Sequence, residues 1–151
     1  MFTREEHKAI NKTFWTSFGT VMKPHRSAAG NKVNWANYNT QAKSMFVRLK
    51  AEKQMASFNL DFECKDLDIR ELQLEQFAEL NNLLNAQLPA PLIAEELIVD
   101  ERIVSRFSQT IEAVSLYRKE TWPDIFSFFK SYLLPFDEFW VDFKDLFVQL
   151  K

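Results

Sequence analysis

The chain has 151 residues, 46% of them hydrophobic and fifteen of them Phe, which is enough apolar surface for a folded core and excludes a disordered segment. Its net charge of −2 is unevenly distributed, because residues 1–60 hold ten Lys or Arg against three acids, whereas residues 61–151 hold nine against eighteen. Two His, one Cys and two Gly exclude a zinc site built from Cys and His alone, an intramolecular disulfide and a glycine-rich phosphate loop.

The compartment is predicted from both ends of the chain. The first residues, Met1–His7, are charged where a signal peptide has an apolar run. Near the C-terminus, Lys130, Asp137 and Asp142 interrupt the aromatic run before it reaches the ~20 apolar residues of a membrane span. We therefore expect a single domain over residues 1–151, bacterial in type and cytoplasmic, with no membrane association, no cofactor and no metal.

The N-terminal part of the chain predicts a helix, a loop and a weak strand. A capping box of Thr3 and Glu6 starts a helix that we expect from Arg4 to Met22. Its buried positions recur at helical spacing: Ile10, Phe14, Phe18 and Val21. The polar residues Pro24–Asn31 predict a loop, and Val33–Tyr38 predicts a short strand.

Two further segments predict a hairpin with a defined register. Ser44–Ala51 and Ala56–Cys64 both alternate apolar and polar residues. Folding one onto the other pairs the apolar positions on one face, with Met45, Val47 and Leu49 opposite Phe62, Leu60 and Phe58. The other face then carries polar side chains, and Cys64 falls on the apolar face as an inert thiol.

A central helix and a second hairpin follow. Asp68 and Glu71 predict the start of the helix. Its expected apolar stripe is Ile69, Leu72, Phe77, Leu80 and Leu84. The hairpin is predicted from Leu92–Val99 and Arg102–Gln109, which place Glu95 opposite Arg106, Leu97 opposite Val104 and Ile98 opposite Ile103. Val114–Tyr117 predicts a further short strand.

The C-terminus predicts two helices separated at Pro135. The first begins at Thr121–Asp124, and the second carries an apolar stripe of Phe136, Phe139, Trp140, Phe143, Phe147 and Leu150. The acids of the second helix, Asp137, Glu138, Asp142 and Asp145, are expected on its solvated face. The fold class is therefore α+β, an antiparallel sheet of four to six strands with N-terminal, central and two C-terminal helices packed on it.

Several sequence segments resemble a known family. They are FWTSFG (14–19), SAAGNKVNWANYNTQAKSMFVRLKAE (27–52), LEQFAELNNLL (74–84), IVSR (103–106) and TWPDIFSFFKSYLLPFDEFW (121–140). The chain resembles the bacterial domain of unknown function 4268 family, nearly from end to end. The resemblance implies a short stand-alone member, whose relatives also include C-terminal domains behind nuclease-like modules, and it implies an association with nucleic-acid processing. It supplies no catalytic residues.

One short pattern is typical of an enzyme. Glu63-Cys64-Lys65 matches the acid-x-Lys half of a metal-dependent nuclease site, in which carboxylates hold the metal and Lys assists the attacking water. Such a site needs a second Asp from an upstream strand, and no Asp precedes Asp61. The nuclease that uses Glu63 and Lys65 is therefore the alternative hypothesis.

The leading hypothesis concerns the polar face of the first hairpin. Arg48, Lys50 and Phe46 share this outward face, and Trp35 stands opposite Phe46 if the weak strand pairs there. Two more cations, Lys32 and Arg26, are close in sequence. Cations beside exposed aromatic rings suit phosphate contact with base stacking, so we expect a non-enzymatic accessory or interaction domain that binds nucleic acid or another polyanion. The same face could serve a homodimer, with Trp35 and Phe46 as contacts.

Overall fold

The computed structural model describes residues 2–149, and within them it contains three α-helices and a four-stranded antiparallel sheet. In chain order the elements are α1 (Arg4–Met22), the 3₁₀ turn η1 (Trp35–Asn37), β1 (Met45–Ala51), β2 (Met55–Phe62), α2 (Leu67–Asn85), β3 (Ile93–Val99), β4 (Arg102–Glu112), the 3₁₀ turn η2 (Lys119–Thr121) and α3 (Trp122–Val148). The strand order β1-β2-β4-β3 joins the two hairpins through β2 and β4. The predicted α+β class is confirmed.

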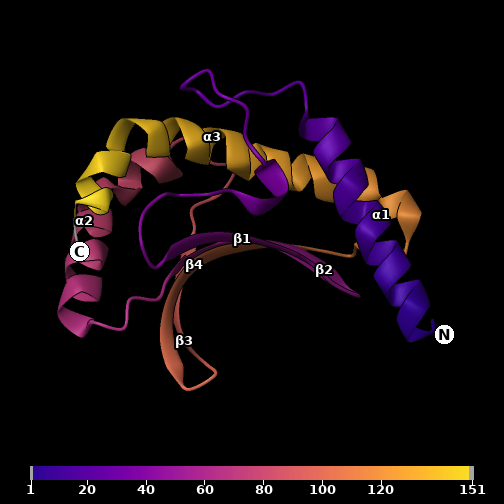
Figure 1. The fold of residues 1–151 in the computed structure, drawn as a ribbon, viewed down its shortest axis with the longest axis horizontal. Helices are drawn as coiled ribbons and strands as arrows, with labels where there is room; N and C mark the ends of the chain where they lie inside the picture. Colours follow the sequence, from indigo (N-terminus) through magenta and orange to yellow (C-terminus); the bar gives the residue numbers. More distant parts are fainter. Residues whose placement is uncertain (1, 150–151) are drawn as a thin grey trace.

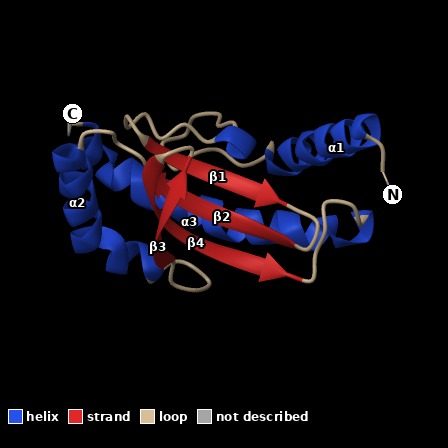
Figure 2. Ribbon diagram, turned by 90° about the horizontal axis from the view of Figure 1, so that it is seen from below, coloured by secondary structure: helices blue, strands red, loops and turns tan. Residues whose placement is uncertain are grey.

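The helices gather on one side of the sheet (Figure 1). α3 runs along that side, α1 lies at one end of it and α2 at the other, where α3 also ends. Seen from below, the opposite side of β1, β2 and β4 is left without a covering helix among residues 2–149 (Figure 2). The β3–β4 hairpin curls away from the helices on this open side.

Both predicted hairpin registers are confirmed. In β1 and β2, Met45 pairs with Phe62, Val47 with Leu60 and Leu49 with Phe58. The apolar face meets α3, because the Phe58 ring stacks on Tyr132 with centroids 5.6 Å apart and lies 6.1 Å from Phe136. In the second hairpin, Glu95 pairs with Arg106, Leu97 with Val104 and Ile98 with Ile103. Alternation of side chains thus identified the core face of both hairpins.

The C-terminal aromatic stripe is core, as predicted, but it lies on one helix instead of two. α3 continues through Pro135, which costs about 3 kcal/mol in a helix interior because the ring removes a hydrogen bond and crowds the preceding turn. The lost bond would have reached the carbonyl of Ser131, which is half-buried near the surface. On the sheet side, Leu133 and Phe136 are fully buried, and burial of such side chains offsets this cost.

The predicted strand Val33–Tyr38 is wrong. This segment forms a loop with the turn η1, and Trp35 points inward, where its indole N–H donates to the His25 carbonyl oxygen at 2.9 Å. The Tyr38 hydroxyl donates to Asp137 at 2.7 Å. Asp137 is therefore buried, and the expectation that it is solvated is also wrong. It accepts two further bonds, from the Ser27 hydroxyl at 3.0 Å and the Ala28 backbone N–H at 2.7 Å, which fasten the loop to α3.

Three smaller expectations need correction. Val114–Tyr117 is a turn, because Ser115 exchanges hydrogen bonds with the Thr121 hydroxyl instead of pairing with a strand. The N-cap of α2 is Asp66, two residues earlier than expected, and Leu72 is exposed. In α1 the capping box forms as predicted, but Met22 takes the buried position expected for Val21. Leu150 of the predicted stripe lies outside the described residues.

Candidate functional site

The floor of the open side of the sheet is built from small polar side chains of β2. Ser57, Asn59 and Asp61 point to this side in the predicted alternation, yet they are only 4%, 2% and 0% exposed. The longer side chains of Arg48 on β1 and Arg106 on β4 flank them. Asn59 is satisfied locally, since its amide donates to the Arg48 carbonyl and the Ser57 hydroxyl at 3.0 Å each. The open side therefore has a polar floor, in contrast to the aromatic helix side.

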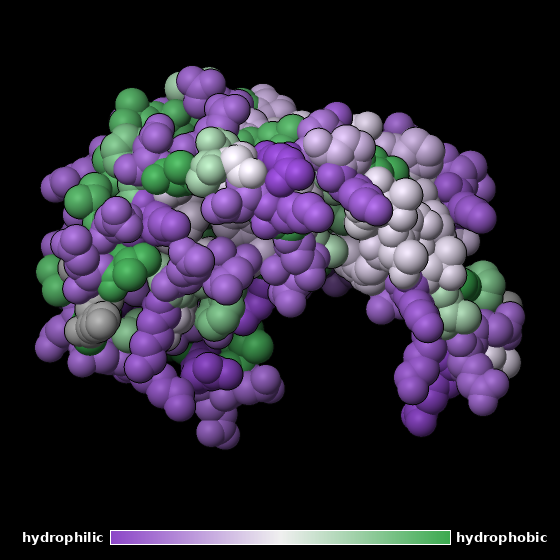
Figure 3. Space-filling model, turned by 45° about the horizontal axis from the view of Figure 1, so that its top comes forward, coloured by the Kyte–Doolittle hydropathy of each residue, from purple (hydrophilic) through white to green (hydrophobic). Residues whose placement is uncertain are grey.

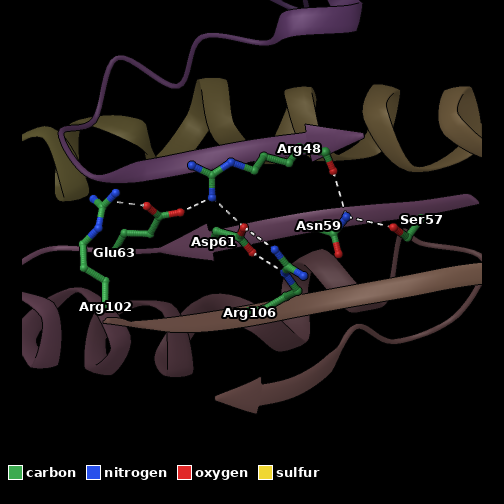
Figure 4. A network of polar contacts seen from close by, with 7 residues as sticks. All are labelled: Arg48, Ser57, Asn59, Asp61, Glu63, Arg102 and Arg106. Atoms are coloured by element: carbon green, nitrogen blue, oxygen red, sulfur yellow. Dashed lines mark hydrogen bonds and ion pairs between the residues drawn. The ribbon is translucent and has the colours of Figure 1, made fainter. Parts of the chain in front are cut away.

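A chain of alternating charges crosses this floor (Figure 4). Arg106 donates two hydrogen bonds to Asp61, at 2.8 and 2.9 Å, and Arg48 donates to the same carboxylate at 2.7 Å. Arg48 also bonds Glu63, whose other oxygen lies 3.8 Å from Arg102. Three arginines against two carboxylates leave one excess positive charge (3 − 2 = +1).

The two acids of this chain are buried, while one of its arginines is loosely held. Burial alone would lower the pKa of Arg48, but hydrogen bonds to Glu63 and Asp61 outweigh it and raise that pKa above its ordinary value. Hydrogen bonds to Asp61 likewise raise the pKa of Arg106. Arg102, in contrast, is 51% exposed and has only the longest contact of the chain. Of the three, it is the guanidinium most available to a ligand.

A hollow of about 860 Å³ adjoins the Arg102 end of the charge chain. It lies where the loop before β1, the start of β1, the β2–α2 connection and the start of β4 meet. Figure 3 shows that the molecule as a whole is arched, with a wide open notch whose visible borders are largely hydrophilic. The lining of the hollow includes the exposed cations Lys43, Lys65 and Arg102, the acids Glu63 and Asp66, the exposed ring of Phe46, and Cys64.

Both acids of the hollow are already engaged. Glu63 belongs to the charge chain, and the Asp66 carboxylate accepts the backbone N–H groups of Asp68 and Ile69 at 3.0 and 3.2 Å as the N-cap of α2. The ion pairs among residues 2–149 do not involve Lys43 or Lys65. The hollow therefore presents cations to solvent, while one of its acids is paired with arginines and the carboxylate of the other, the exposed Asp66, is hydrogen-bonded at the start of α2.

The residues of the predicted basic face are only partly brought together. Phe46, Arg48 and Lys50 share the open side as expected, with Phe46 41% exposed and the Arg48 guanidinium 4.5 Å from its ring centroid. Trp35 does not stand opposite Phe46. It is 3% exposed in the core, and the strand partner of Phe46 is Asp61, so Trp35 is also unavailable as a dimer contact.

The other two predicted cations lie elsewhere. Arg26 donates to the Gly30 carbonyl within its own loop at 3.4 Å. Lys32 lines a separate hollow beside Asp137 and Lys144 of α3. Sequence reasoning missed Arg102 as a site residue, because its position beside Glu63 depends on the pairing of β4 with β2, which neither strand encodes by itself.

A family model described as Domain of unknown function (DUF4268) matches residues 10–144. The chain belongs to this family. The resemblance noted in the sequence is thereby confirmed. No curated protein and no solved structure matches the chain. None of the helices within residues 2–149 of this DUF4268 chain is long and apolar enough to cross a membrane.

The acid-x-Lys pattern of this DUF4268 chain lies in the same region. Asp61 and Glu63 both bond one nitrogen of Arg48, so a guanidinium occupies the space between the two carboxylates. No cluster of three or more His, Cys, Asp or Glu that could hold a metal occurs among residues 2–149. Cys64 follows the end of β2 half-buried at the hollow, so its expected place on the apolar strand face is wrong.

Proposed function

We propose that this DUF4268 chain is a non-enzymatic binding domain that takes single-stranded nucleic acid at the hollow beside β1. The phosphates would lie against Lys43, Lys65 and Arg102, and a base would stack on Phe46. The observation that carries the proposal is the charge state of the hollow, where the acids are internally bonded and the cations face solvent. Phosphate contacts of this kind supply most of the affinity of sequence-tolerant nucleic-acid binding.

The exposed aromatic ring favours an unpaired strand over a duplex. Phe46 is 41% exposed, and Arg48 below it is fixed by Asp61 and Glu63, so the ring has a rigid charged support. Stacking of a base on such a ring stabilises the complex by about 1–3 kcal/mol, and it requires a base that is not already paired. The hollow is concave, which suits a bent single strand better than the convex surface of a duplex.

The experiment is a titration of labelled single-stranded DNA, single-stranded RNA and duplex DNA, by fluorescence anisotropy at low and physiological salt. Replacing Lys43 and Lys65 together by Ala should weaken binding and reduce the slope of log affinity against log salt by about 1.4, since each phosphate contact of a single strand contributes about 0.7. A matched control replaces Lys8 and Lys12 on α1, which are exposed and outside the hollow.

The role of the aromatic ring needs its own variant. Phe46→Ala should weaken single-strand binding more than duplex binding, without changing the salt slope. Equal losses in the Lys43/Lys65 variant and the Lys8/Lys12 control would contradict this site, because binding would then follow net charge alone. Cleavage of the nucleic acid in the presence of Mg²⁺ or Mn²⁺, abolished by Glu63→Gln or Lys65→Ala, would contradict a non-enzymatic role and favour the nuclease alternative.

A further inference from the structure

β3 is an edge strand with an unusually exposed surface. It pairs with β4 on one side only, and no strand within residues 2–149 pairs with its outer edge. Six of its seven side chains are exposed, among them Ile93 at 63% and Ile98 at 79%. Ile93 and Val99 lie on one face of β3, and Ile98 lies on the other face, where it pairs with the exposed Ile103 of β4. Isolated apolar residues on a surface are common, but exposed apolar residues on both faces of a free strand edge are typical of an interaction site.

The strand lacks most of the usual protections of an edge. Edge strands are commonly blocked by Lys, Pro or a bulge, and Ile93–Val99 contains neither Lys nor Pro. Its pairing with β4 is continuous from Ile93 with Ser108 to Val99 with Arg102, so no bulge interrupts it. The backbone groups of the outer edge are thus arranged to accept a further strand.

The charges that β3 and its turn carry are all negative. Residues 93–101 contain no Lys or Arg and hold four acids, Glu95, Glu96, Asp100 and Glu101. The nearest cations are Arg102 and Arg106 of β4, on the inner side of the strand, opposite Val99 and Glu95. Glu95 stands opposite Arg106, but that guanidinium is committed to Asp61. None of the ion pairs among residues 2–149 involves Glu95 or Glu96. Each face of β3 therefore presents one carboxylate without a direct ion pair among the described residues, and the Glu95 carboxylate has the charge of Arg106 nearby.

We propose that β3 accepts an extended basic segment of a partner protein as a fifth strand of the sheet. The segment would pair its backbone with the outer edge, as in other cases of strand addition. Two adjacent cations in the middle of it would lie opposite Glu95 and Glu96, one on each face, and apolar residues at its ends would cover Ile93 and Ile98. Opposite charges and apolar pairs across strands are the contacts that stabilise such pairing.

The same charges argue against a second copy of this chain as the occupant. Pairing of β3 with β3 of another molecule brings two Glu95 and two Glu96 side chains together without a cation, and like charges across strands are destabilising. Pairing of β3 with the opposite edge strand β1 of another molecule is a head-to-tail contact, which would propagate into open-ended chains of molecules.

The test uses three synthetic peptides with capped ends. The probe is Thr-Val-Ile-Lys-Lys-Ile-Val-Thr, the charge-swapped peptide has Glu in place of both Lys, and the third has Pro in place of both Ile, which prevents regular pairing. Binding is measured by calorimetry, and amide hydrogen exchange of the protein locates it. We expect the Lys peptide to bind best and to slow the exchange of alternate amides in β3.

The decisive experiment changes the charges on the protein. Glu95→Gln with Glu96→Lys should weaken the Lys peptide about fivefold to tenfold and allow the Glu peptide to bind. The matched control, Glu120→Gln with Glu138→Lys, changes the net charge equally at exposed sites on other elements.

Equal weakening by the control pair, binding without slower exchange in β3, equal binding of the Pro peptide, or no binding of any peptide would each overturn the proposal. Concentration-dependent oligomers of the wild type that disappear in the Glu95/Glu96 variant would overturn it in favour of self-association. No residue of the hollow beside β1 is changed in this experiment, so its result is independent of nucleic-acid binding.

Discussion

Replacement of Asp61 by Ala tests the charge chain that crosses the open side of the sheet. Asp61 is fully buried and accepts three hydrogen bonds from two arginines. Removing one partner of a buried ion pair typically costs about 3–5 kcal/mol, because the other charge stays behind without compensation. Here Arg48 is 38% exposed and keeps Glu63, whereas Arg106 is 13% exposed and loses its only ion-pair partner among residues 2–149. We therefore expect a loss at the lower end, about 3 kcal/mol in the free energy of unfolding.

Urea unfolding followed by circular dichroism measures this loss, with Glu112→Ala as control. Glu112 is an exposed acid at the end of β4, and its removal should change stability by less than about 0.5 kcal/mol. The double variant Asp61→Ala with Arg106→Met should lose less than the sum of the single variants, by about 1–3 kcal/mol, because the stranded cation is gone. A loss below about 1 kcal/mol for Asp61→Ala, or strict additivity in the double variant, would refute the reasoning.

Three further predictions concern the helix side of the molecule. Leu60→Ala should cost about 2–5 kcal/mol in urea unfolding, since Leu60 is fully buried between the sheet and the helices, and a loss under about 1 kcal/mol would contradict that packing. Truncation after Leu134 should give insoluble or unfolded protein, and a soluble fragment with a cooperative melt would show that the last part of α3 is not needed for the core. Burial raises the pKa of Tyr38 above its ordinary value of about 10, and the hydrogen bond to Asp137 and the negative charge of Asp137 raise it further. The stability that Tyr38 contributes is therefore present below about pH 10 and is lost as the pH rises above it. Unfolding in urea at rising alkaline pH should therefore show a steeper loss for the wild type than for Tyr38→Phe, and parallel curves would exclude this contribution.

The alternation of apolar and polar residues predicts the two hairpins, but it does not predict how the hairpins join into one sheet. The alternation in β1 and β2 admits one register that keeps Val47 and Leu60 on the same face, and a shift by one residue would expose both. The alternation does not predict that β2 pairs with β4, because α2 and β3 separate these two strands along the chain. The charge chain depends on this second pairing, which brings Arg106 beside Asp61. The ion pairs between the acids and the arginines of this charge chain could therefore not be predicted from the sequence.

The errors at Trp35 and Asp137 have a common physical cause. The residues around Trp35 alternate as in a strand, and Asp137 lies among solvated acids on α3. The sequence neighbours of each residue therefore predict a strand for Trp35 and solvent exposure for Asp137. In the fold both lie beneath the loop between α1 and β1, where Asp137 accepts three hydrogen bonds and Trp35 donates one. Tertiary contacts of a loop decide these positions, and such contacts leave no periodic signal.

Protection of Cys64 tests most directly whether a nucleic-acid strand occupies the hollow. Cys64 is the single cysteine of the chain, is half-buried, and lines the hollow together with Lys43, Phe46 and Lys65. The rate of its reaction with a thiol reagent is measured with and without saturating single-stranded DNA, where saturation is established by anisotropy. The proposed function predicts a slower reaction in the complex and recovery of the free rate at high salt, as the strand dissociates. An unchanged rate at saturation, or no binding at low salt, would contradict it.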